Sequence, residues 1–362
     1  MWWYQHIIIV IVLLITITIV ENVELNYLNN VNTLYFNENS QFKIIQFTDL
    51  HYGEGESTDW GPEQDINSTR VMNTILDFES PVDLIVFTGD LVTGNNVVSN
   101  ATKYWQEAVQ VAIDRSIPWI VAFGNHDDLS SGTGGSRDDL MAFDQSLGSL
   151  SQFGPLSIPG VSNYYINLQN SMHEMIGRLW VFDSGDGSCP PGNDGRFTGS
   201  KYQCNTYITN EQIQWYLNES DPTLFAMAFF HIPLQEYMDL WNYQTCFGYN
   251  NDSVACQPVN EGLYNAFEKV GDVKVVTVGH NHGNDYIGSI PGHNITMCYG
   301  RHSGYGGYGT WERGARVFQL QANPFTNDIT YETWIRYETG QLQFQQPIHY
   351  PNQTNPQTQC TV

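Results

Sequence analysis

Short polar segments that follow apolar runs constrain this chain more than any other feature. The runs at 42–47, 84–87, 119–123 and 273–278 are rich in Ile, Val and Phe, as buried β-strands are. The polar segments, four of which directly follow an apolar, β-branched run, are Asp49-Leu50-His51, Gly89-Asp90, Gly124-Asn125-His126-Asp127, His231 and Gly279-His280-Asn281-His282. Because α/β proteins collect their functional side chains at the carboxyl ends of strands, we expect these segments to meet in one site.

Between these runs, apolar residues recur at helical spacing. Helices are predicted at 67–79, 101–115, 137–147, 210–219 and 261–270, and further strands at 164–168, 179–182 and 224–230. The alternation in the first half predicts βαβ crossovers, and the strand-rich second half predicts a second sheet packed on the first. After residue 278, only short strand-like pieces are expected, as far as about residue 337. The prediction is therefore an α/β domain over residues 42–337.

The polar segments carry side chains that bind metal ions. Asp49 and His51 lie two residues apart in extended chain, so both can face one ion. The two oxygens of Asp90 can bridge two ions, and Asn125 offers a neutral oxygen ligand. Mixed imidazole and oxygen ligation suits zinc, manganese or iron, and no cysteine is needed. We expect two divalent or trivalent metal ions, whose identity the sequence does not specify.

The order, spacing and flanking glycines of these segments resemble the calcineurin-like metallophosphoesterase superfamily from about Phe42 to Trp311. Residues 299–307 and 313–316 are most similar to a plant and fungal branch labelled purple acid phosphatase-like. The resemblance implies a two-sheet β-sandwich flanked by helices, in four layers α/β/β/α. It also implies two ions about 3.5–4 Å apart. The implied ligands are Asp49, His51, Asp90 and His282 for one ion, and Asp90, Asn125, His231 and His280 for the other.

Two positions depart from purple acid phosphatases. Those enzymes have a tyrosine three residues after the bridging aspartate, where this chain has Thr93, and they lack the histidine found here as His51. One ligand is missing and another is present, so the first ion keeps its ligand count. Some members of the branch are called probably inactive because of the missing tyrosine, which this ligand set does not require.

The resemblance implies hydrolysis of phosphoric esters by a water held between the two ions. His126 follows a ligand without being one, so it is expected to protonate the leaving oxygen or to stabilise developing charge. Arg301 and His302 precede a glycine-rich loop and are candidates to hold phosphate, although a structural salt bridge explains Arg301 equally well. A phosphomonoesterase is expected. A phosphodiesterase or nucleotidase with the same centre and a non-catalytic metal-binding glycoprotein remain as alternatives.

Composition limits the partners. The net charge is −24, from 14 basic and 38 acidic residues, and no Lys/Arg cluster is present to neutralise a nucleic acid backbone. We therefore expect no direct nucleic-acid binding. The expected substrate is a phosphorylated small molecule or a phosphoprotein, attracted by the metal ions rather than by the overall field of the protein.

Several features predict entry into the secretory pathway, hence a secreted, endomembrane or lysosomal location. The uncharged apolar run 7–20 predicts a signal peptide over residues 1–20, with an uncleaved anchor or a buried strand as alternatives, and no stable membrane span if it is cleaved. Six glycosylation sequons occur, at Asn67, Asn100, Asn218, Asn251, Asn294 and Asn352. Residues 341–362 are expected to form an extended polar tail.

The even number of cysteines favours disulfides in an oxidising compartment. Local pairing would join Cys189 to Cys204 and Cys246 to Cys256, leaving Cys298 and Cys360 for each other. Six cysteines allow 15 connectivities, and six reduced thiols are the alternative.

Overall fold

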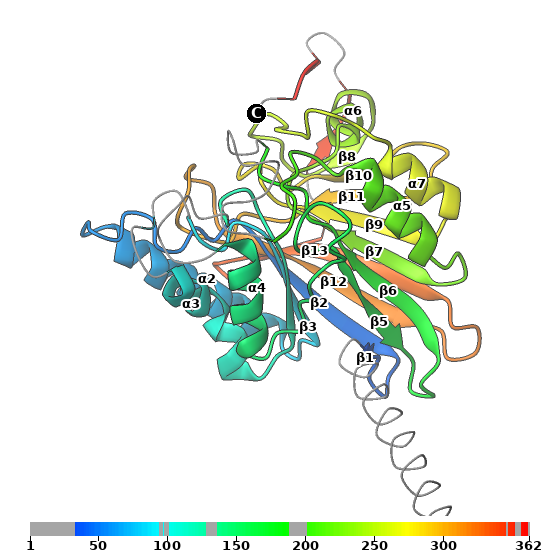
Figure 1. The fold of residues 1–362 in the computed structure, drawn as a ribbon, viewed down its shortest axis with the longest axis horizontal. Coiled ribbons are helices and arrows are strands. Elements are labelled where there is room, and N and C mark those ends of the chain that lie inside the picture. The colour runs from blue at the N-terminus through cyan, green and yellow to red at the C-terminus, as the bar shows by residue number, and fades with distance from the viewer. Residues whose placement is uncertain are drawn as a thin grey trace, which may run out of the picture.

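Two β-sheets lie face to face, with helices on both outer faces (Figure 1). The computed structural model describes residues 33–93, 97, 101–127, 136–187, 201–344, 347–351 and 356–360. The nine-stranded sheet has the order β1 (Thr33–Tyr35), β5 (Tyr164–Gln169), β6 (Met175–Val181), β7 (Phe225–Phe229), β9 (Val273–Val278), β11 (Thr296–Tyr299), β10 (Ile287–Ser289), β8 (Cys246–Phe247), β15 (Ile348–His349). The six-stranded sheet has the order β14 (Leu342–Gln343), β13 (Ile329–Tyr337), β12 (Gly314–Ala322), β2 (Gln41–Phe47), β3 (Leu84–Thr88), β4 (Trp119–Ala122).

The helices divide between the two outer faces. They are α2 (Gly61–Glu79), α3 (Ala101–Arg115), α4 (Arg137–Ser146), α5 (Asn210–Glu219), α6 (Glu236–Tyr243) and α7 (Leu263–Val270). Helices α2, α3 and α4 lie beside the six-stranded sheet, and α5 and α7 cover the nine-stranded sheet (Figure 1). The predicted α/β fold, a helix-flanked sandwich of two sheets, is confirmed.

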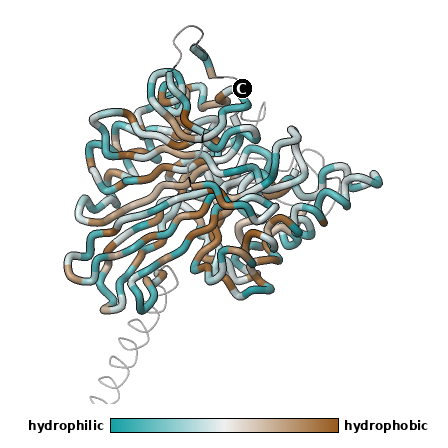
Figure 2. Tube along the Cα trace, turned by 180° about the vertical axis from the view of Figure 1, so that it is seen from behind, coloured by the Kyte–Doolittle hydropathy of each residue, from teal (hydrophilic) through white to brown (hydrophobic). Residues whose placement is uncertain are grey.

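Strand periodicity explains why the nine-stranded sheet is buried on both faces. In β6, Leu179 and Val181 join the core between the sheets, whereas the alternate Trp180 and the following Phe182 join the core beneath α5 and α7. Successive side chains of a strand point to opposite faces, so one apolar run supplies both cores. Hydrophobic segments accordingly run along the central strands, whereas the outer loops are largely hydrophilic (Figure 2).

The parallel strands end close together, which positions the site. β2, β3 and β4 are parallel neighbours, and so are β6, β7, β9 and β11. Gln46 of β2 joins the two sheets near these ends. Its amide donates to the carbonyl of Val278 at 3.1 Å, and its oxygen accepts from the Thr277 hydroxyl at 2.6 Å. The carboxyl ends of β2 and β9 are therefore held against each other.

Some elements differ from the sequence prediction. Helix α2 begins at Gly61, before the predicted start at residue 67. Its first turns were missed because they are polar and show no apolar period. Strands β12 and β13 have nine residues each, where short pieces were expected, and they pair antiparallel along their whole length. The exposed, polar positions of β13 interrupt its apolar pattern. Helix α6 was not predicted.

The predicted pairing of Cys246 with Cys256 and of Cys298 with Cys360 is wrong. The structure joins Cys256 to Cys360 across 104 residues and leaves Cys246 and Cys298 as buried thiols. Spacing favoured the local partner, but pairing depends on which Cα atoms the fold brings within bonding reach, here 4.9 Å. Cys204 is also disulfide-bonded, and its predicted partner at position 189 lies outside the described residues.

The predicted signal peptide at 1–20 lies outside the described residues. Within the described ranges, no helix combines the length and apolar content that crossing a membrane would require. Among the sequons in these ranges, Asn218, Asn251 and Asn294 are exposed and Asn67 is half-buried. Residues 341–360 contribute β14, β15 and the disulfide at Cys360, so this segment is attached to both sheets.

Candidate metal centre

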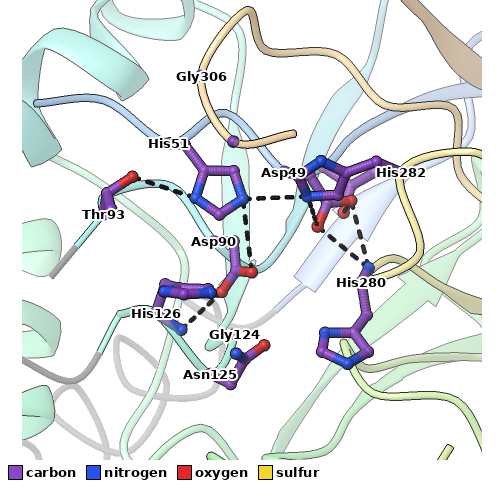
Figure 3. A network of polar contacts seen from close by, with 12 residues as sticks. Asp49, His51, Asp90, Thr93, Gly124, Asn125, His126, His280, His282 and Gly306 are labelled. Carbon is purple, nitrogen blue, oxygen red and sulfur yellow. Dashed lines mark hydrogen bonds and ion pairs between the residues drawn. The ribbon is translucent and has the colours of Figure 1, made fainter. Parts of the chain in front are cut away.

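The predicted polar segments meet where β2, β3, β4, β7 and β9 end (Figure 3). Two groups of three side chains lie there, and within each group the ligand atoms are within 4.8 Å of one another. We call Asp49, His51 and His282 the first group, and Asp90, His231 and His280 the second group. These six residues come from β2, β3, β7 and β9, strands of both sheets, so the site spans the edge where the sheets meet.

Asp90 lies between the two groups. Its Oδ2 is 3.1 Å from Nε2 of His231 and 3.7 Å from Nε2 of His51. Its other oxygen, Oδ1, accepts a hydrogen bond from the backbone of His126 at 2.8 Å. A carboxylate oxygen at this position can serve both groups, which is the role predicted for Asp90.

The second group places hydrogen-bond acceptors around one point. Nδ1 of His231 lies 2.8 Å from the carbonyl of Thr88, which can only accept, so Nδ1 carries a proton. The opposite nitrogen, Nε2, faces Oδ1 of Asn125 at 3.0 Å and Nδ1 of His280 at 3.2 Å, in addition to Asp90. Acceptors that converge in this way need a positive charge between them, so these residues fit a cation.

The first group has the same character. Nδ1 of His282 lies 2.9 Å from the carbonyl of Tyr308, closer than the amide of that residue at 3.3 Å, which favours a proton on Nδ1 and the lone pair on Nε2. That Nε2 is 3.1 Å from Nε2 of His51 and 3.6 Å from Oδ1 of Asp49. Metal-binding histidines are commonly oriented by a hydrogen bond from the second ring nitrogen to a carbonyl or another polar group. In His51 the second nitrogen is Nδ1, which lies 3.1 Å from Oγ1 of Thr93.

The backbone is strained at the same residues. Asp49, His51, Asp90 and His280 all have positive φ angles, between 52° and 76°. A non-glycine residue rarely adopts this conformation, and such residues cluster at functional sites when the surrounding fold fixes them. Here the turn that ends each strand directs its side chain back toward the centre of the site.

Asp127 fixes the loops after β3 and β4. Its buried carboxylate accepts from the backbone amides of Asp90 at 2.9 Å, Leu91 at 2.9 Å, Val92 at 3.2 Å and Gly124 at 2.7 Å. Gly124 has no room for a side chain, because a Cβ there would lie 2.2 Å from Oδ1 of Asp90. Asp127 thus orients neighbouring residues.

Burial and mutual charge set the protonation of the carboxylates. Burial raises the pKa of Asp49 to about 7. The charge of His231 lowers this pKa, and the charge of Asp90 raises it. Burial would also raise the pKa of Asp90, but the charges of His231 and His126 hold it well below its usual range. Asp90 therefore stays ionised between the two groups.

The histidines separate into one cationic and three neutral rings. Burial would lower the pKa of His231, but the charge and hydrogen bond of Asp90 raise it to about 9. Burial lowers the pKa of His280 to about 3, assisted by the charge of His231, and that of His282 to about 4. Burial also brings the pKa of His51 well below its usual range. In the metal-free protein, a proton on His231 thus supplies the positive charge.

Comparisons with known proteins agree with this geometry. The model of the family described as calcineurin-like phosphoesterase matches residues 42–284. The chain belongs to this family. It is 32% identical over 315 residues to "Probable inactive purple acid phosphatase 28" of Arabidopsis thaliana, covering 80% of this chain and 77% of that protein. It is 31% identical over 333 residues to "Phosphatase DCR2" of Saccharomyces cerevisiae, covering 83% of this chain and 54% of that protein.

A solved structure shares the fold. The crystal structure of a dimetal phosphatase from Danio rerio matches with a TM-score of 0.52 at 14% identity, covering 80% of this chain and 98% of that one. At this identity the likeness concerns the fold alone. The relatives in plants and yeast bear out the predicted purple acid phosphatase-like branch. Together with the family's dinuclear centre, the two ligand groups support two metal ions.

The other predicted site residues of this family member have different surroundings. The His126 ring is half-buried and lies beside that of His51, with ring centroids 5.1 Å apart. Arg301 is buried and donates to Oδ2 of Asp285 at 2.8 Å, which favours the salt-bridge alternative over phosphate binding. His302 is buried against His282, with ring centroids 4.0 Å apart, and its Nε2 lies 3.2 Å from the carbonyl of Gly306.

Sequence reasoning missed two residues that support this centre. Tyr308 contacts His282 through both its ring and its carbonyl. Arg137 of α4 is fully buried, donates to the carbonyl of Gly124 at 2.8 Å and pairs with Asp183 at 2.8 Å. Neither residue stands in a motif. A buried arginine on a short polar helix gives no periodic signal that distinguishes it from a surface residue.

Proposed function

We propose that this chain is a metal-dependent phosphohydrolase that acts on phosphomonoesters. The observation that supports this most is the position of Asp90 between two ligand groups, with its Oδ2 directed at a histidine of each. Two cations held there would supply Lewis-acid chemistry by withdrawing charge from phosphoryl oxygens and lowering the pKa of water. The acidic protein as a whole repels phosphate, so attraction must come from this centre.

His126 is the proposed general acid. Its backbone amide is engaged by Asp90, while its ring lies next to His51 at the site. In hydrolysis, a water oxygen bonds to phosphorus and the bond to the leaving oxygen breaks. The ring of His126, in its protonated form, passes a proton to that leaving oxygen. Such help is typically worth about 10²–10⁴-fold in rate.

The names of several plant relatives include the word inactive, but the site of this chain is consistent with activity. Thr93 stands where purple acid phosphatases have a tyrosine, and it supports His51 through its hydroxyl. His51 in turn completes the first group of ligand atoms. Although Thr93 replaces that tyrosine, this chain still has a full set of candidate ligands.

We further propose that the protein is secreted or lumenal and glycosylated. The disulfide between Cys256 and Cys360 supports an oxidising compartment. The exposed positions of Asn218, Asn251 and Asn294 are accessible to glycosylation. Mass spectrometry of protein from its native source would detect the glycans, and unmodified peptides at all three positions would contradict this part.

The function is tested on metal-free protein reloaded with zinc, manganese or iron in turn. We expect hydrolysis of p-nitrophenyl phosphate to exceed that of bis-p-nitrophenyl phosphate, and chelator to abolish both. Faster hydrolysis of the diester would favour the phosphodiesterase or nucleotidase alternative. Stable binding of two ions without hydrolysis of either ester would favour a non-catalytic metal-binding glycoprotein.

The variant His126→Ala tests the general acid. We expect turnover of a monoester to fall about 10²–10⁴-fold, while elemental analysis shows unchanged metal content. His173→Ala is a suitable control, because His173 is exposed in the turn between β5 and β6, at the other end of the sheet. Wild-type turnover in His126→Ala would exclude the proposed role.

A further inference from the structure

The ring of Tyr308 covers one of the candidate ligands. It stacks on the imidazole of His282, with ring centroids 4.0 Å apart and planes inclined by 11°. Nδ1 of His282 lies 2.9 Å from the carbonyl of the same residue and 3.3 Å from its backbone amide. The shorter contact favours a proton on Nδ1 that the carbonyl accepts. Tyr308 therefore determines both the tilt of the imidazole and the nitrogen that carries its proton. With Nδ1 protonated, the lone pair on Nε2 faces Asp49 and His51.

Tyr308 needs an anchor of its own. It lies in the glycine-rich loop 303–309 and is 49% exposed. Gly307 and Gly309 on either side both have positive φ angles, so the local backbone has few conformational restrictions. The anchor is a hydrogen bond from the Tyr308 hydroxyl to Oδ2 of Asp252. The same hydroxyl accepts from the backbone amide of His282 at 3.4 Å.

The segment that carries Asp252 also holds the loop of His280 and His282. The carbonyl of Ser253 accepts from the side chain of Asn281, which lies between the two histidines, at 3.1 Å. The backbone amide of Asn251 donates to the carbonyl of Gly283 at 3.1 Å. Residues 251–253 thus contact both neighbours of His282: its own loop on one side and Tyr308 on the other.

We propose that Tyr308 is a positioning residue for the first group of ligands, and that its hydrogen bond to Asp252 holds it in that role. The inference rests on the proposed function only in requiring that this group binds a metal ion. Loss of the hydroxyl would release the loop, and the ring and carbonyl would then no longer constrain His282. The second group does not contact Tyr308 through any described hydrogen bond or ring contact.

The decisive variant is Tyr308→Phe, which removes the hydroxyl and keeps the ring and the carbonyl. Tyr305→Phe is a matched control in the same loop: its hydroxyl donates to Glu338 at 2.8 Å. We propose titrating metal-free protein with Zn²⁺ by calorimetry, where the wild type should show two binding events. Tyr308→Phe should weaken one event about tenfold and leave the other unchanged, because partners that orient a ligand typically contribute ten- to a hundredfold in affinity.

Two further measurements separate positioning from general stability. The melting temperature of Tyr308→Phe should match that of Tyr305→Phe. In the double variant with Asp252→Ala, zinc affinity should be no weaker than in Tyr308→Phe alone, since Tyr308→Phe already removes the bond to Asp252. Imidazole NMR of the zinc-free protein should show His282 protonated on Nδ1 in the wild type and as a mixture of tautomers in Tyr308→Phe.

The results that would overturn the inference are distinct from those that would overturn the function. Unchanged zinc affinities in Tyr308→Phe, or equal weakening of both events, would refute the positioning role. A wild type that binds no zinc, manganese or iron would refute both proposals. Two zinc events in the wild type with no hydrolysis of any ester would refute the phosphohydrolase proposal alone.

Discussion

The two groups of candidate ligands are supported by different parts of the chain. In the second group, the carbonyl of Thr88, at the buried end of β3, orients His231 at 2.8 Å. In the first group, the hydroxyl of Thr93 lies 3.1 Å from His51, and the half-exposed Tyr308 orients His282. One group thus relies on main chain at a strand end, and the other on a side chain and a surface loop.

This difference indicates where sequence variation can act. A carbonyl at a buried strand end is present whatever the side chain, so support for the second group survives most substitutions. The hydroxyl of Thr93 can be replaced without loss of the fold, and the carbonyl of Tyr308 lies in a loop held by the bond from its side chain to Asp252. We therefore expect the second group to keep its properties among related chains and the first group to set differences in metal affinity. Three predictions test this comparison, from the largest expected effect to the smallest.

Asp90→Asn should affect both groups at once, because Oδ2 of Asp90 approaches a histidine of each. The variant loses the negative charge and, in one amide orientation, places a donor toward His231. We expect affinity for both ions to fall more than about a hundredfold, beyond the effect of removing an orienting partner. Elemental analysis after dialysis measures this. Loss of one ion with retention of the other would assign Asp90 to a single group.

The two groups should respond differently to pH. The pKa of His231 is about 9, so below pH 9 an ion in the second group must displace its proton. Affinity there should fall about tenfold for each pH unit between 9 and 7. Asp49 has a pKa of about 7 and the other side chains of the first group are already deprotonated, so its affinity should change little over this range.

Calorimetric titration with zinc at pH 7, 8 and 9 would resolve the two events. Their midpoints should diverge as the pH falls, because one proton is released in the second group and about none in the first. Parallel behaviour of both events would show that the proton is not localised on His231.

Thr93→Val should produce the smallest effect. The change keeps the shape of the side chain and removes the hydroxyl beside Nδ1 of His51. We expect about tenfold weaker binding in the first group alone. Thr88→Val is the matched control: it also removes a buried hydroxyl near the site but keeps the carbonyl that orients His231. Similar losses in both variants would contradict the distinction between the groups.

The ligand positions could be predicted from the sequence because they depend on local pattern. Asp49, Asp90 and His280 follow apolar runs directly, and parallel strands of one sheet end at the same edge. The patterns also predicted a second sheet packed on the first, but they did not show which ligands would come from which sheet. Positive φ angles at the strand ends direct the side chains inward, which periodicity does not reveal.

Supports that join distant segments could not be predicted. Tyr308 contacts His282 across 26 residues of sequence, and its anchor Asp252 is 56 residues away. Such contacts depend on the tertiary fold, as does the pairing of Cys256 with Cys360. The long antiparallel pair of β12 and β13 was missed because exposed polar positions in β13 interrupt its apolar pattern.

The four hydrogen bonds that Asp127 accepts from backbone amides have a consequence for the exchange of metal ions. These bonds lie within the polypeptide and involve no coordination, so the shape of both loops exists before any ion arrives. An ion could then be withdrawn and replaced by a different element without refolding. Because the ligands suit zinc, manganese and iron alike, metal availability would then contribute to which element is bound.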